Sequence, residues 1–249
     1  MLKTLNNAIQ VLNCFTDEKY WWGVRELSRE LNTSHTIISR ILKTFEKNGF
    51  VKQNLETQKY CLGFKFIEFN QIIQKKMSIT EELLPIMRTI SNKTNESIFL
   101  TWKENNEGVT LAIAESEERI KFSVSVGTRT PLHVGASCKS IMAFLTDKEK
   151  NQIINEYTQL QSKFLITNTT VILDELNEIK NQGWVYTSGE YSDRVFGLSA
   201  PLFNKMRQPV ASITIAGPEY RVSDDKREKM LNILKEETEN IQRIIYDVI

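Results

Sequence analysis

Residues 24–63 constrain the fold more than any other part of the chain. Apolar residues recur there with helical spacing, stop at a polar break at residues 32–34, and resume on one face of a second helix that ends at Gly49, a natural helix terminator. Two short β-prone runs, residues 50–52 and 59–62, follow around a polar tip. Helix, tight turn, helix and hairpin together predict a winged helix, a module that commonly places its second helix in the DNA major groove.

The second helix of this motif presents a polar face that suits contact with DNA. Its apolar residues point inward, which turns hydroxyl, imidazole, guanidinium and ammonium groups outward, where they can reach base edges or phosphates. Lysines of the hairpin are placed to meet flanking phosphates. The predicted DNA-binding residues are Ser34, His35, Thr36, Ser39, Arg40, Lys43, Lys52 and Lys59. A solvated helix face that makes no specific contact is the alternative interpretation.

The distribution of charge agrees with a nucleic-acid partner for the first part of the chain. Residues 1–76 hold 12 Lys and Arg against 7 Asp and Glu, a net charge of +5, whereas residues 77–249 hold 20 against 24, a net charge of −4. The basic part coincides with the predicted winged helix, as binding to phosphates requires.

Length and periodicity predict a second domain of mixed structure. A chain of 249 residues that is 41% hydrophobic has enough apolar content for more than one core. An apolar period of two predicts strands at residues 97–102, 109–115 and 121–126. Later helical periods predict helices at residues 147–157, 171–181 and 224–246. We therefore expect an α+β protein with a winged helix-turn-helix domain at residues 1–63, a linker helix at residues 64–80 and a second domain at residues 81–249.

Cysteine usage and hydropathy indicate the compartment. The chain has no run of about 18 apolar residues, which a membrane-spanning helix needs, and its first residues lack the apolar block of a signal peptide. Its cysteines, Cys14, Cys61 and Cys138, are odd in number and far apart, so they fit neither a disulfide framework nor a zinc cluster. We expect a cytoplasmic protein with reduced thiols and without a metal or other cofactor.

Two motifs end the predicted winged helix: RILKTFEKNGFV at residues 40–51 and YCLG at residues 60–63. They resemble the patterns R-L-L-x-T-L-x-x-x-G-aromatic-V and Y-x-L-G of the IclR family of bacterial transcription regulators. Residues 131–143 resemble that family's P-L-H-x-x-A-x-G-K-x-x-L-A signature, with Cys138 where glycine is usual. Segments that resemble the family's later strands follow, so the resemblance spans nearly the whole chain; they are residues 183–190, 198–203 and 209–218.

The resemblance implies that the second domain is GAF-like, binds a small effector and assembles subunits. The implied effector-binding residues are Ala136, Ser137, Thr187, Gly197, Thr214 and Ala216. Backbone N–H groups at the helix start in residues 135–140 favour an anion such as a carboxylate. Several family members carry acidic, thiol or hydroxyl groups where Thr187, Gly197 and Ala216 stand, so a larger or less polar ligand fits better here. The alternative is that these small residues only pack a core.

An enzyme is the competing interpretation, and its active site would pair Cys138 as nucleophile with His133 as base. Such a hydrolase or acyltransferase would use the winged helix only for oligomerisation. The two residues lie five apart across a loop-to-helix junction, and the sequence offers no evident acid to orient the base. We therefore predict no catalytic residues. The expected function is a regulator, expected to be a repressor, that binds a palindromic DNA operator as a homodimer or homotetramer and responds to a small organic acid or related catabolite.

Overall fold

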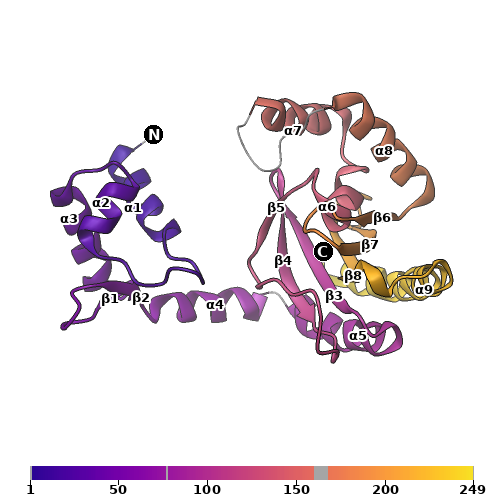
Figure 1. Cartoon of the computed structure of the whole chain (residues 1–249), viewed down its shortest axis with the longest axis horizontal. Helices are drawn as coiled ribbons and strands as arrows, with labels where there is room; N and C mark the ends of the chain where they lie inside the picture. The colour runs from indigo at the N-terminus through magenta and orange to yellow at the C-terminus, as the bar shows by residue number, and fades with distance from the viewer. Residues whose placement is uncertain (1, 77, 160–167, 249) are drawn as a thin grey trace. The chain divides into compact units, whose positions relative to one another are not determined.

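The computed structural model describes residues 2–76, 78–159 and 168–248. The chain divides into two compact units, Met1–Met77 and Ser78–Ile249 (Figure 1). The segment predicted as a linker helix, residues 64–80, contains α4 (Lys65–Lys76) of the first unit and the start of α5 (Ser78–Thr94) of the second. None of the helices that the structure describes is long and apolar enough to cross a membrane.

The first unit is a helix-turn-helix followed by a hairpin, as predicted. Its elements before α4 are α1 (Lys3–Asn13), α2 (Val24–Glu30), α3 (His35–Lys47), β1 (Val51–Gln53) and β2 (Tyr60–Leu62). The two strands pair antiparallel, with Val51 opposite Leu62. Inward-facing apolar residues from all five elements, together with Trp22, form one core: Val11, Trp22, Leu27, Ile38, Ile41, Leu42, Val51 and Tyr60.

Local hydrogen bonds fix where the two helices of the motif begin. The Gly23 N–H donates to the Glu26 carboxylate over 2.9 Å at the start of α2. The Ser34 hydroxyl accepts from the Ile37 N–H over 3.4 Å at the start of α3. Each bond satisfies a backbone or side-chain group at a helix terminus that would otherwise lack an intrahelical partner. Gly49, at φ +77°, then allows the chain to leave α3 and enter β1.

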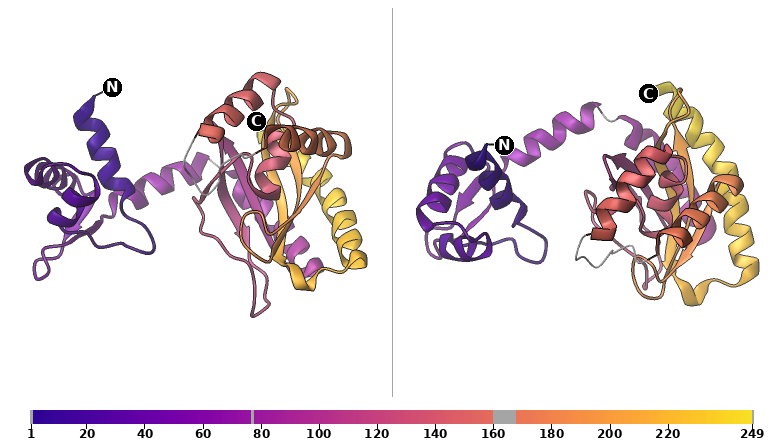
Figure 2. Two further views of the ribbon diagram at one scale, coloured as in Figure 1. Left: turned by 45° about the horizontal axis from the view of Figure 1, so that its top comes forward. Right: turned by 90° about the horizontal axis from the view of Figure 1, so that it is seen from above.

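The second unit is built on one six-stranded antiparallel sheet in the order β5-β4-β3-β8-β7-β6. The strands are β3 (Ser97–Glu104), β4 (Glu107–Ala114), β5 (Arg129–Pro131), β6 (Val185–Ser188), β7 (Val195–Phe203) and β8 (Pro209–Pro218). The remaining helices are α6 (Gly135–Met142), α7 (Asp147–Gln159), α8 (Thr169–Gln182), α9 (Asp224–Val248) and the 3-10 turn Glu219–Arg221. Helices α5 and α9 cover one face, and α6, α7 and α8 lie on the other (Figures 1 and 2). This is an α+β fold consistent with a GAF-like domain.

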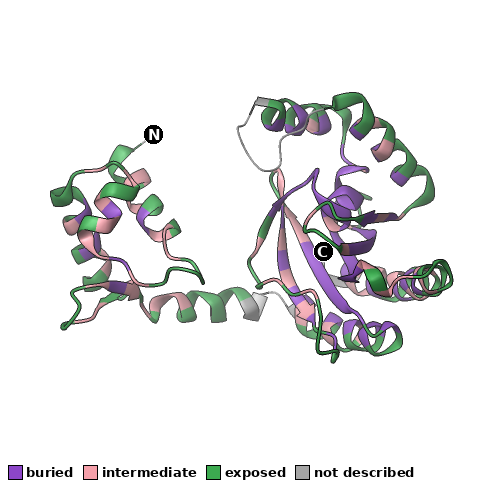
Figure 3. Cartoon of the chain, in the orientation of Figure 1, coloured by how far each residue is buried: buried purple, intermediate pink, exposed green. Residues whose placement is uncertain are grey.

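Alternating side chains divide the sheet between two environments. On β3, Ile98 and Leu100 pack into the core under α5 and α9, whereas Phe99 and Thr101 point to the opposite face. The central strands are buried along nearly their whole length (Figure 3). Such burial requires strands with few charged residues, which β7 and β8 satisfy.

The prediction of a third strand at residues 121–126 is wrong. That segment is an irregular loop, and the third strand in chain order is the shorter β5. Its backbone bonds that of β4 near the end of the loop, where the Gly127 N–H donates to the Thr110 carbonyl over 2.8 Å. Its apolar and polar residues alternate because Phe122 and Val124 turn into a cavity. The alternation of apolar and polar residues therefore indicates a segment with one buried side, and not a strand of the sheet.

Candidate DNA-binding face and ligand-binding cavity

The polar residues of α3 form one outward face, opposite the residues that pack into the core. Ser34, His35, Thr36, Arg40 and Lys43 are exposed. Ser39 is half-buried, and the opposite side of the helix carries the buried Ile38, Ile41 and Leu42. The structure thus brings the predicted residues of this helix together on a surface that offers donors and acceptors to a ligand.

The two lysines of the hairpin differ in their surroundings. Lys52 is exposed on β1. The Lys59 ammonium bonds the Glu26 carboxylate over 2.9 Å. The Gly23 N–H, and after it Lys59, hold the pKa of Glu26 below its usual value. Since the charge of Lys59 is shared with Glu26, Lys52 is the stronger candidate for a phosphate contact in the hairpin.

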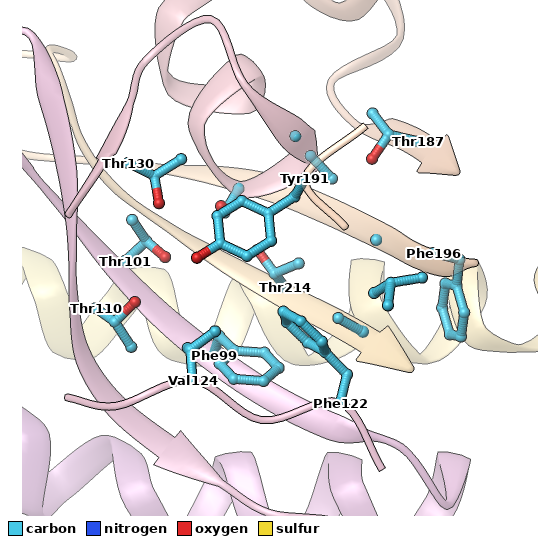
Figure 4. Close-up of a pocket in the computed structure, with 16 residues that line it drawn as sticks. Phe99, Thr101, Thr110, Phe122, Val124, Thr130, Thr187, Tyr191, Phe196 and Thr214 are labelled. Carbon is cyan, nitrogen blue, oxygen red and sulfur yellow. The ribbon is translucent and has the colours of Figure 1, made fainter. Parts of the chain in front are cut away.

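The six predicted effector-binding residues all line one cavity of the second unit (Figure 4). This cavity, here called the α6 cavity, has a volume of about 60 Å³ and lies among the first turn of α6, the facing strands and two loops. The cavity is open to solvent on one side, so this volume sets no upper limit on the size of a ligand. Apolar and hydroxyl side chains dominate its lining, which is the basis for expecting a less polar ligand.

Two glycines allow α6 to approach the sheet. Gly135 begins the helix at φ +70°, and a Cβ atom there would lie 3.3 Å from the Cβ of Tyr191. Gly197 lies on β7 beneath the helix, where an added Cβ would come within 2.9 Å of the Cβ of Ala136. The close approach brings the backbone N–H groups at the start of α6 to the cavity wall, where the helix dipole favours negative charge.

Hydroxyl groups connect the cavity floor to the interior. The Thr214 hydroxyl bonds that of Ser199 over 2.9 Å, and Ser199 lies 3.0 Å from the Ser140 hydroxyl on α6. The Ser212 hydroxyl donates to the Ser137 carbonyl over 2.7 Å. These bonds fix α6 against β7 and β8 and so hold the shape of the cavity.

An ion pair links α6 to the loop that covers the cavity. The Lys139 ammonium, buried on α6, bonds Glu175 of α8 over 2.8 Å and Glu190 over 2.7 Å. Glu190 immediately precedes Tyr191, whose ring lines the cavity and meets that of Phe122 with a centroid separation of 5.8 Å. Lys139 therefore anchors a loop that contributes a wall of the α6 cavity.

The sequence did not indicate nine of the residues that line the cavity. They come from β3, β4, β5, β7 and the covering loops: Phe99, Thr101, Thr110, Phe122, Val124, Thr130, Tyr191, Val195 and Phe196. The alternation in the predicted strands could have pointed to Phe99 and Thr101, which share a face. The loop residues carry no such signal.

The surroundings of Cys138 do not suit a nucleophile. Cys138 is fully buried, its Sγ lies 3.6 Å from the Thr130 carbonyl, and burial raises the pKa of its thiol to about 12. His133 packs its ring against Tyr157 at a centroid separation of 4.6 Å. A protonated, enclosed thiol is inert towards substrates. Across the described ranges no cluster of three His, Cys, Asp or Glu side chains could hold a metal ion.

Comparison with known proteins agrees with both halves of this architecture. The model of the IclR helix-turn-helix domain matches residues 4–55, and the model of the bacterial transcriptional regulator IclR C-terminal domain matches residues 71–243. The HTH-type transcriptional regulator KipR of Bacillus subtilis is 27% identical over 98% of this chain and 97% of its own. The transcriptional repressor IclR of Escherichia coli is 18% identical over 90% of this chain and 83% of its own.

Solved structures share the fold over nearly the full chain. Thermotoga maritima IclR superposes with a TM-score of 0.74 and 26% identity, covering 98% of this chain and 99% of its own. An IclR homologue from Microbacterium hydrocarbonoxydans, complexed with 4-hydroxybenzoate, superposes with a TM-score of 0.81, 17% identity and coverage of 98% and 99%.

A helix-turn-helix domain joined to an α+β domain of this kind is the architecture of a DNA-binding transcription regulator. The chain belongs to the IclR family of bacterial transcription regulators.

Proposed function

We propose that the protein is a ligand-responsive repressor that binds a palindromic operator as a dimer and changes its affinity for DNA when a small organic acid or related catabolite occupies the α6 cavity. The observation that carries the proposal is the combination, in one chain, of an exposed basic face on α3 and a half-open cavity in the second unit. Ligand binding alters DNA affinity by favouring one of two pre-existing states. Two relatives, from Escherichia coli and Salmonella typhimurium, are named repressors.

Exposed apolar side chains in the first unit support a dimer. Leu2, Leu5 and Ile9 project from one side of α1 and its start, and each is at least half exposed. Ile67, Ile72 and Ile73 of α4 are also more than half exposed. A second copy of this chain is the proposed occupant of this surface, because helix-turn-helix proteins read two half-sites with a two-fold pair of helices.

The start of α6 supports an acidic effector. Its free backbone N–H groups and the Ser137 hydroxyl lie at the cavity wall and would donate to a carboxylate. A homologue of the same fold is complexed with 4-hydroxybenzoate, a carboxylate.

An electrophoretic shift of DNA from upstream of the protein's own gene tests the proposal. The wild-type protein is expected to retard this DNA, with affinity that falls as salt rises, because bound phosphates release counterions. Arg40→Ala is expected to weaken binding at least about tenfold, since it removes a bidentate donor from the α3 face. Lys47→Ala is the matched control: it removes one positive charge from the last turn of the same helix and should change binding less.

Absence of a shift at low salt, or equal binding by the wild type and Arg40→Ala, would contradict the regulator proposal. The repressor assignment is tested separately by reporter expression, which should rise when the gene is deleted. Reporter expression that falls on deletion would make the protein an activator.

A further inference from the structure

Three threonines place their hydroxyl groups at one end of the α6 cavity. Thr101, Thr110 and Thr130 come from β3, β4 and β5, and their oxygen atoms turn into the cavity beside the Tyr191 hydroxyl (Figure 4). Each threonine is more than nine-tenths buried. Among the described residues, no hydrogen bond joins these three hydroxyls to another part of the protein. Their oxygens are open to the cavity rather than enclosed, so they are free to bond a ligand there, and three such groups at one place point to a ligand with matching polar atoms.

A β-bulge creates this arrangement. Leu100 of β3 pairs with Ala112, but the next residue, Thr101, pairs with Thr110, which leaves Leu111 as an extra residue on β4. Without the bulge, Thr110 would keep the orientation of Ala112, which packs under α5. The extra residue turns Thr110 into the α6 cavity instead. Bulges that re-aim a side chain are frequent beside binding sites.

The lining of the α6 cavity carries no formal charge. The sixteen described residues around it include neither Lys, Arg or His nor Asp or Glu. A carboxylate placed at the threonine end would lose its hydration without gaining a cation, which is strongly unfavourable. Hydroxyl groups both donate and accept, so this end matches an uncharged ligand oxygen that does the same.

Aromatic side chains border the threonine end. Phe99 and Phe122 lie with ring centroids 5.5 Å apart, and Phe122 meets Tyr191 edge-on. Adjacent strands are about 4.8 Å apart, so hydroxyls from neighbouring strands can reach two ligand oxygens at a similar spacing. The geometry thus combines a flat apolar wall with a row of hydrogen-bonding groups.

We propose that Thr101, Thr110, Thr130 and Tyr191 form a subsite that recognises uncharged hydroxyl or carbonyl groups on a small, flat effector. This inference rests on the proposed function, and it adds a second point of recognition to the one at the start of α6. The effector carries its uncharged oxygens at the end remote from any acidic group. Thr101, Thr110 and Thr130 determine its specificity.

Calorimetric titration of the full chain with three ring compounds tests the subsite. Resorcinol carries two uncharged hydroxyls, 1,3-difluorobenzene replaces both with groups that cannot donate, and isophthalate replaces both with carboxylates. Wild-type protein is expected to bind resorcinol at least about tenfold more tightly than either of the others, since unpaired polar groups in a site penalise the wrong ligand. The triple variant Thr101→Val, Thr110→Val, Thr130→Val should lose this preference while keeping the shape of the cavity.

Thr94→Val is the matched control, because it makes the same change at a buried threonine of α5 that lies outside the cavity lining, and it should retain the preference for resorcinol. Tyr191→Phe is a second test, because it changes a loop residue, keeps the aromatic ring and does not alter the strands. It should reduce the preference for resorcinol severalfold. Tightest binding of isophthalate, a preference that survives in the triple variant and in Tyr191→Phe, or failure of all three compounds to bind would overturn the subsite. Electrophoretic DNA shifts with the same protein preparations distinguish failure of the subsite from failure of the proposed function. A protein that binds DNA but shows no preference for resorcinol refutes the subsite alone.

Discussion

At the scale of single residues, Cys138 shows how its neighbours decide the chemistry of a side chain. Gly108 on the facing strand makes room for its sulfur, because a Cβ on Gly108 would lie 2.7 Å from it. Burial raises the pKa of the thiol to about 12, so the thiolate form is scarce at neutral pH. The residue that most resembles a nucleophile in the sequence is a packing residue in the structure.

Alkylation measures this directly. In the folded protein at pH 8, iodoacetamide should modify the half-buried Cys61 but leave Cys138 unmodified, and both should react after unfolding. Peptide mass spectrometry distinguishes the sites. Because folding raises the pKa of Cys138 from 9 to about 12, the native state keeps a proton that the unfolded state releases. Stability should therefore fall as pH rises through that window, and Cys138→Ala should reduce the fall. Rapid alkylation of native Cys138 would restore the enzyme hypothesis.

The residues of the α6 cavity that belong to recognisable motifs could be predicted from the sequence. Those whose orientation depends on strand register or on loop position could not. Ala136 and Gly197 were assigned by resemblance, and both line the α6 cavity. Thr110 was missed, because its orientation depends on a bulge that leaves no mark in the local pattern. Tyr191 was missed, because loop residues follow no period and their position depends on anchors distant in sequence.

At the scale of elements, the contact between α6 and β7 is the closest that the side chains allow. Gly197→Ala should therefore lower the stability of the second unit by about 1–3 kcal/mol, the usual cost of overpacking. Ala136→Gly removes the opposing Cβ atom, so the cost of Gly197→Ala should be smaller in that background. Urea denaturation of the wild type, the two single variants and the double variant measures the coupling free energy between the two positions. Equal costs in both backgrounds would show that the strand and helix separate without strain.

Elements with a family motif or a long helical period were predicted well. The resemblance placed a strand at residues 209–218, and β8 has the same limits. The helical pattern at residues 147–157 corresponds to α7, which extends two residues further. The segment at residues 121–126 failed because alternation shows that one side of a segment is buried, but not whether a neighbouring strand covers its backbone.

At the scale of the whole molecule, the apolar surface of the first unit makes a prediction about assembly. The double variant Leu5→Lys, Ile9→Lys should convert the proposed dimer to a monomer in analytical ultracentrifugation, because two buried ammonium groups cannot be accommodated in an apolar interface. Leu55→Lys, at an exposed residue in the hairpin, is the control and should leave assembly unchanged. A double variant that remains dimeric would place the interface elsewhere.

The fold of the whole chain was predictable because its two halves differ in composition and period. Basic helical segments precede residue 77, and alternating strands follow residue 97. The limits of the joining segment were less predictable: one linker helix was expected at residues 64–80, whereas α4 ends at Lys76 and α5 begins at Ser78.

The pairing of Lys139 with Glu190 has a consequence for the speed of the response. Movement of the loop bearing Tyr191 would separate Glu190 from an ammonium whose side chain is only 9% exposed. Breaking this contact would raise the barrier, for entry and for exit alike, of any ligand that passes this loop. We expect the bond to lengthen the residence time of a ligand without changing its equilibrium affinity. The cell would then experience a delay between the disappearance of the metabolite and the change in transcription.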